Sequence, residues 1–213
     1  MRQILTLFTV FIFAQYSYAG ECGHTAFIKD FVKNNDVELT GYYFHPDHCF
    51  SVIIPKGVIG RDNSGPSSHH GFGAILPKET GGDYLLVQGD WGAELDNPHD
   101  IAGSLNQIII TRLKWIAEDG AVILKKKVED TILANLQAKH LIIKYKCKES
   151  GATFWQNSIY AIDSGGSIYE ISLDASPDTY KQSCIIRNKI AKTWKLESKK
   201  CKEELNKRIK KTF

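Results

Sequence analysis

The segment from residue 97 to residue 120 constrains the fold most, because it has the pattern of one long amphipathic helix. Asn97 and Pro98 favour a helix start, since an Asn side chain can cap free N–H groups and proline has none to leave unpaired. Gly120 is typical of a helix end. Between them the apolar residues recur at helical spacing: Ile101, Leu105, Ile108, Ile109, Leu113 and Ile116. This stripe needs a second layer to pack against, and strand-like runs on both sides predict a sheet.

Alternating and β-branched runs predict four strands before this helix and four after it. The expected strands are residues 39–45, 49–55, 70–77, 83–90, 121–127, 139–147, 154–163 and 167–173, with a loop over residues 57–68. A second helix is expected after Ser176-Pro177-Asp178, with an apolar face ending at Trp194. Arg187 interrupts this face, and we expect it either at the edge of the stripe with its stem packed, or paired.

The first 19 residues are predicted to be a signal peptide, with Arg2, an apolar run over residues 4–14 and a small-residue exit near Ala19. This run is too short to cross a bilayer, which takes about 20 residues. We therefore expect a periplasmic or secreted product with one α+β domain over residues 20–196. Residues 197–213 form a basic C-terminal tail.

The five cysteines all follow the predicted signal peptide, so disulfides are expected after export. Sequence alone cannot select two bridges among five cysteines. The preferred pairing is Cys22–Cys49 and Cys147–Cys184, with Cys201 free in the tail.

The charge balance argues against nucleic acid as a partner, because 27 Lys and Arg face 24 Asp and Glu and no dense basic face is evident. The exception is the tail from Lys195, which carries eight Lys or Arg against three acids. It is expected to be a solvated tail, and contact with an anionic membrane surface is the alternative.

The order of elements predicts an α+β fold, in which a mostly antiparallel sheet of about six to eight strands carries the mid-chain helix and the C-terminal helix. This order resembles the PsbP-like α/β/α sandwich proteins over residues 40–196, through the stretches 50–57, 69–73 and 186–194. The resemblance implies a small exported bacterial protein. Few members of such sandwiches have a demonstrated active site, so it also favours a non-catalytic role.

The segment from Asp90 to Asp100 is the main candidate for binding a partner protein. It is acidic, has no Lys or Arg, and carries Trp91, a residue type enriched at interfaces. We expect Asp90, Trp91, Glu94 and Asp96 to contact a basic partner. The alternative interpretation is an ordinary acidic lead-in to the helix, with Trp91 folded onto the sheet.

A metal or acid–base site is the second hypothesis, at His69, His70 and Asp90. A hairpin turn near residues 80–81 would place His70 opposite Trp91 and bring these residues to one end, although a register slip would change the pairs. Adjacent histidines on a strand point to opposite faces, which argues against shared binding.

No phosphate-binding glycine loop or nucleophile elbow is present, and no cofactor is expected. The sequence therefore favours an exported, non-catalytic binding protein of the immunity or adaptor type. A metal-dependent hydrolase and a membrane-surface protein are the alternatives.

Overall fold

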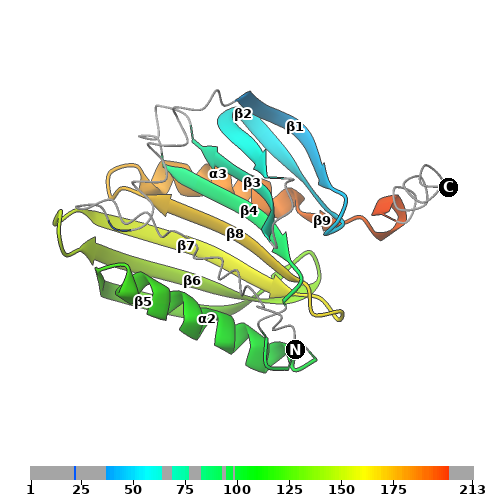
Figure 1. Ribbon diagram of the computed structural model, residues 1–213. Coiled ribbons are helices and arrows are strands. Elements are labelled where there is room, and N and C mark those ends of the chain that lie inside the picture. Colours follow the sequence, from blue (N-terminus) through cyan, green and yellow to red (C-terminus); the bar gives the residue numbers. More distant parts are fainter. Residues whose placement is uncertain are drawn as a thin grey trace, which may run out of the picture.

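The computed structural model describes residues 22, 37–63, 69–76, 83–92, 95–97 and 99–201 of the 213-residue chain (Figure 1). The predicted signal peptide, Glu94 and the tail beyond Cys201 lie outside these residues. In the described part, no helix is both long and apolar enough to cross a membrane.

The described strands form one antiparallel sheet, in the order β1-β2-β3-β4-β8-β7-β6-β5, with the short β9 beside β2. The strands are β1 Val37–His45, β2 Phe50–Asn63, β3 His69–Ile75, β4 Tyr84–Asp90, β5 Ala121–Leu133, β6 Leu136–Cys147, β7 Thr153–Ile162, β8 Ile168–Ala175 and β9 Lys195–Leu196. The helices are α2 Ile101–Glu118 and α3 Tyr180–Thr193. The α+β class with a mostly antiparallel sheet is confirmed.

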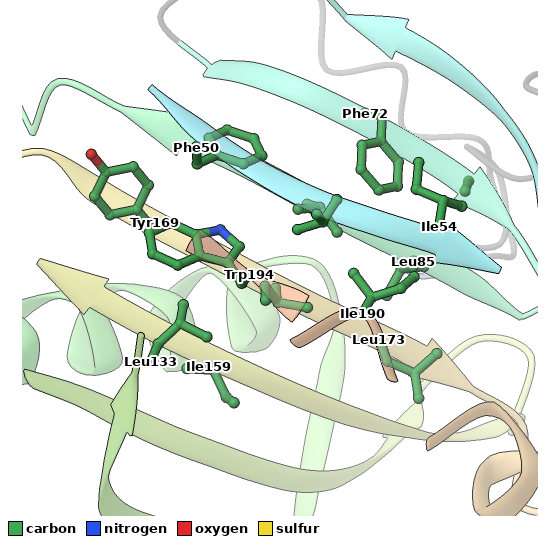
Figure 2. Close-up of a cluster of buried hydrophobic side chains, with 14 of the residues drawn as sticks. Phe50, Ile54, Phe72, Leu85, Leu133, Ile159, Tyr169, Leu173, Ile190 and Trp194 are labelled. Atoms are coloured by element: carbon green, nitrogen blue, oxygen red, sulfur yellow. The ribbon is translucent and has the colours of Figure 1, made fainter. Parts of the chain in front are cut away.

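The two helices cover opposite faces of the sheet, so the chain forms an α/β/α sandwich (Figure 1). Side chains alternate along β7: Ile159 packs in the apolar cluster with Ile190 of α3, whereas Tyr160 packs in the cluster with Ile109 of α2. Figure 2 shows the α3 cluster, where Trp194 lies beside Tyr169 and Phe50. These two clusters contain most of the described apolar side chains.

The N-cap of α2 lies three residues after Asn97, the capping residue that the sequence suggests. Asp100 is the N-cap, and its side chain accepts a 3.0 Å hydrogen bond from the Gly103 N–H. Asn97 instead shapes the preceding turn, because its carbonyl oxygen accepts a 2.8 Å bond from the Ser104 hydroxyl. Gly120 follows the helix with φ +79°, as expected of a helix end.

Two segments are more extended than the sequence suggests. Residues 57–63, expected in a loop, continue β2 after Gly57 (φ +83°) and pair with β1 and β3. Strands β5 and β6 extend to a two-residue turn at Ala134 and Asn135, both with positive φ. Cross-strand pairing outweighs weak local preference in both places.

The β3–β4 hairpin differs from the expected register by two residues. Asp90 pairs with His69, and Gly89 pairs with His70. Because a shift of two keeps every side chain on its face, the same residues still meet at this end.

The disulfide pairing expected from the sequence is wrong. The bridges are Cys22–Cys147 and Cys49–Cys201, and Cys184 is left unpaired. Cys147 on β6 packs in the cluster under α2, whereas Cys184 on α3 packs against the opposite face of the sheet. The sheet therefore separates the two residues that we expected to be bonded.

The chain returns to β2 after α3, so the residues up to Cys201 are attached to the sheet. Lys195 and Leu196 of β9 pair with Ser51 and Phe50. Glu197 accepts a 2.8 Å bond from the Ser51 hydroxyl, and its N–H donates to the Cys49 carbonyl at 2.7 Å.

Arg187 is not at the solvent edge of α3. It is only 3% exposed, and the Nη1 atom donates to the Asn188 side chain at 2.8 Å. Burial lowers its pKa to about 10.

Candidate functional site

Three buried histidines gather at one end of the sheet, beneath an exposed tryptophan. His45 ends β1, His48 lies in the β1–β2 turn, His70 lies in β3, and Trp91 follows β4. The three histidines are 1%, 3% and 5% exposed, whereas Trp91 is 55% exposed. The group therefore consists of three buried imidazole rings with a solvent-exposed indole ring packed on them.

The rings pack directly on one another. The centroids of the three imidazoles lie 5.2–5.4 Å apart in every pairing. The Trp91 ring lies 4.8 Å from His48 and 5.1 Å from His70. Trp91 is thus held in place on one side while more than half of its surface faces solvent.

The β1–β2 turn is fixed over this end of the sheet from several directions. The Tyr169 hydroxyl of β8 donates to the His48 carbonyl at 3.3 Å. The His48 N–H lies 3.3 Å from His45 Nδ1, which orients that ring. The Cys49–Cys201 bridge then ties the end of the turn to the C-terminal segment.

The electrostatics keep His48 neutral near physiological pH. Burial, together with the neighbouring His45 and His70, lowers the pKa of His48 to about 4 against the opposing effect of Asp90 and Asp47. A neutral imidazole is the form that can accept a proton or a metal ion.

Asp47 joins this group from the exposed turn. Its carboxylate lies 3.6 Å from His70 Nδ1. One potential ligand atom from each of His45, Asp47 and His70 lies within 4.8 Å of the others. Two imidazoles and a carboxylate in such proximity can bind a divalent transition metal.

The expected partner-binding residues do not all lie beside this group: Trp91 packs on it, whereas the N–H of Asp96 donates to Gln107 of α2 at 3.2 Å. Trp91 is exposed, Asp96 is exposed, and Asp90 is half-buried with its carboxylate accepting a 3.2 Å bond from the Gly92 N–H. Glu94 lies outside the described residues. One side of the Trp91 ring packs on His48 and on His70 of β3, as the alternative of a tryptophan folded onto the sheet expects, and the ring stays 55% exposed.

Of the three residues hypothesised to bind metal, only His70 belongs to the described ligand group. In the register of the sheet, His69 pairs with Asp90 and directly precedes His70 in β3. His45 and Asp47 were not expected from the sequence as partners of His70. The signal available was a His-x-Asp-His run over residues 45–48 in a turn between two strands.

A second polar group lies on the opposite face, between α2 and the centre of the sheet. Asp174 accepts bonds from Tyr145 at 3.1 Å and Gln156 at 3.2 Å, and Gln88 donates to Glu170 at 2.7 Å. Burial alone would lower the pKa of Arg112, but nearby Tyr160 and the two carboxylates raise it, so the guanidinium stays charged. Because most of these atoms bond to one another, the network is best explained as support for α2 on the sheet.

No protein-family model matches the chain, and no curated protein sequence is significantly similar to it. Among solved structures, cyanobacterial PsbP (CyanoP) from Synechocystis sp. PCC 6803 superposes with a TM-score of 0.53 and 14% identity, covering 84% of this chain and 98% of that one. LpqN of Mycobacterium tuberculosis, described as involved in cell envelope biogenesis, superposes with a TM-score of 0.50 and 17% identity, covering 80% and 95%.

The chain has a PsbP-like fold. The resemblance inferred from the order of elements is therefore confirmed at the level of architecture. At these identities the PsbP-like fold says nothing of a ligand or a reaction, so the function has to be argued from the residues of the site. The two disulfides are consistent with an exported protein.

Proposed function

We propose that this PsbP-like chain is an exported, non-catalytic protein of the adaptor or immunity type, which binds another protein through Trp91 and the acidic residues beside it. The observation that carries the proposal is the exposure of Trp91 on a rigid, buried base of imidazole rings. A pre-positioned aromatic ring loses little freedom on binding, which is why tryptophan is common at interface hot spots.

The charges around Trp91 favour a basic partner surface. Asp47 is exposed on the turn that carries His48, Asp90 is half-buried directly before Trp91, and Asp96 is exposed five residues after it. An acidic rim around an aromatic anchor would accelerate encounter with a Lys- or Arg-rich surface and contribute less to the final affinity.

The test compares two exposed tryptophans in one fold. Trp115 on α2 is 47% exposed, close to the 55% of Trp91, but lies on the other side of the sheet. Trp91→Ala and Trp115→Ala variants would be expressed with a tag in the native host, cross-linked, purified under denaturing conditions and analysed by quantitative mass spectrometry.

We expect a protein recovered with the wild type and with Trp115→Ala to be lost with Trp91→Ala. A hot-spot residue contributes about 2 kcal/mol, or roughly 30-fold in affinity. Glu94→Lys should weaken recovery in the same direction and more strongly at low salt. Equal recovery with both tryptophan variants, while thermal unfolding shows each to be folded, would refute the proposal.

A further inference from the structure

We propose that His45, Asp47 and His70 form a binding site for a divalent transition metal, with Zn²⁺ as the preferred ion. This inference does not depend on the proposed function, because the metal would bind the isolated chain. Trp91 is not among the proposed ligands, although the two sites lie side by side and share Asp47.

The first argument is proximity. The ligand atoms of the three residues lie within 4.8 Å of one another, although His45, Asp47 and His70 come from a strand end, a turn and a different strand. The His70 Nδ1 and Asp47 Oδ2 atoms are 3.6 Å apart, a separation that two ligands of one ion can have. Small side-chain rotations would bring all three to bonding distance of about 2 Å from a common centre.

The second argument is the state of the His70 ring. His70 is 5% exposed, and neither of its ring nitrogens has a hydrogen-bond partner among the described residues. Buried polar atoms are nearly always paired in folded proteins, so an unpaired imidazole next to a carboxylate requires an explanation. A metal ion would supply the missing interaction for His70.

The third argument is the chemistry of the donors. Two imidazole nitrogens and one carboxylate oxygen suit Zn²⁺ and its first-row neighbours, whereas Ca²⁺ and Mg²⁺ prefer oxygen ligands alone. Three protein ligands leave a further coordination position open. Asp47 is exposed on the turn, so one of the three proposed ligands is open to solvent.

The test is direct titration of the disulfide-bonded chain, freed of metal with a chelator, with ZnCl₂ by isothermal calorimetry. We expect one Zn²⁺ to bind per chain and no comparable binding of Mg²⁺. Addition of Co²⁺ should give visible absorption bands, which indicate a Co²⁺ complex with fewer than six ligands. The variants are Asp47→Asn and His70→Gln. Their matched controls are Asp130→Asn, at an exposed carboxylate on β5, and His99→Gln, at an exposed histidine.

Loss of a ligand should weaken Zn²⁺ binding by about tenfold or more, since loss of an outer partner alone can cost that much. Both controls should bind as the wild type does. If His70→Gln fails to fold, Asp47→Asn on the exposed turn still decides the matter. Absence of 1:1 Zn²⁺ binding, or binding that survives Asp47→Asn unchanged, would overturn the proposal and would leave the Trp91 interface untouched.

Discussion

Gly89 and His48 approach so closely that no side chain could stand at position 89. A Cβ atom there would lie 2.5 Å from His48 Cγ and 2.6 Å from His48 Cβ, although the two residues belong to β4 and to the β1–β2 turn. The glycine at this position of β4 is thus what allows the turn that carries His48 to pack against the sheet beside His70 and Trp91.

We expect Gly89→Ala to destabilise the protein by about 1–3 kcal/mol, as overpacking does in a buried site. The clash is with the base of the ring rather than with a flexible end, so His48 cannot avoid it by changing rotamer. Urea denaturation measures the change. Gly165→Ala, where the nearest atom is Asp163 Oδ1 at 3.2 Å in an exposed turn, should cost clearly less; equal losses in both variants would contradict this account.

The disulfides predict which cysteine reacts with a thiol reagent. Only Cys184 should be modified in the native chain, slowly, because burial raises the pKa of its thiol. Cys184→Ser should leave stability nearly unchanged. Cys201→Ser should release Cys49 and cost about 2–5 kcal/mol, as removal of a native bridge does. Peptide mapping without reductant that found a Cys147–Cys184 peptide would reject the assignment.

We expect His140 to make the protein less stable in acid. Burial lowers the pKa of His140, and Arg187 and Lys127 lower it further, against the 2.7 Å contact with Asn157 and the charge of Glu129. Since the folded pKa lies below the unfolded value near 6.5, the unfolded chain takes up the proton first. His140 therefore favours folding fully above pH 6.5 and progressively less as the pH falls towards its folded pKa.

The measurement is the free energy of unfolding between pH 7.5 and pH 4.5, with His140→Gln as the reference. Glutamine keeps a hydrogen-bonding group beside Asn157 and does not titrate. The wild type should lose stability relative to this variant on acidification, and parallel pH profiles would show that the inferred direction is wrong.

The β5–β6 turn offers a stabilising change. Ala134 (φ +44°) and Asn135 (φ +72°) occupy a two-residue turn in which Asn-Gly is the favoured pair. Ala134→Asn combined with Asn135→Gly should raise the free energy of unfolding by about 0.5–1 kcal/mol, since the strain of alanine is removed. Asn135→Val should lower it. A melting temperature that rises with Asn135→Val would contradict the turn geometry.

We expect that the charge of Arg187 on α3 can be removed without loss of stability. Its Nε and Nη2 atoms are buried and have no hydrogen-bond partner within the described part of the chain. Replacing it with methionine, of similar length, should leave stability unchanged or raise it, because the desolvation cost disappears. Arg187→Ala should destabilise through the cavity it leaves. Chemical denaturation of the two variants separates charge from packing.

The fold could be read from the sequence where pattern and burial agree. Three such features are the apolar stripe of α2 with Leu105 and Ile109, the glycine at position 120 and the alternation along β6. Each reflects the local backbone or the packing of these side chains against the neighbouring layer. Residues 57–63 could not be assigned in this way, because their strand state depends on neighbours in β1 and β3 rather than on their own propensity.

The candidate site was predictable only in part, for a related reason. Trp91 and His70 could be brought together from the sequence because they lie at the ends of a hairpin that its turn residues predict. His45, His48 and Asp47 lie in a separate hairpin, and no local signal tells that this turn packs onto β3 and β4. The disulfide partners were missed because strand alternation places Cys147 on one face, while the helix carrying Cys184 covers the other.

The return of the chain to β2 has a consequence for the covalent topology. Cys22–Cys147 and Cys49–Cys201 span 125 and 152 residues, and the two loops overlap. A single protease cut at any peptide bond between Cys22 and Cys201 therefore leaves both fragments joined. Such a nicked molecule would migrate as one species in electrophoresis until a reductant is added. It would therefore stay in one piece in an extracellular setting, where the fragments of a chain without crosslinks would separate.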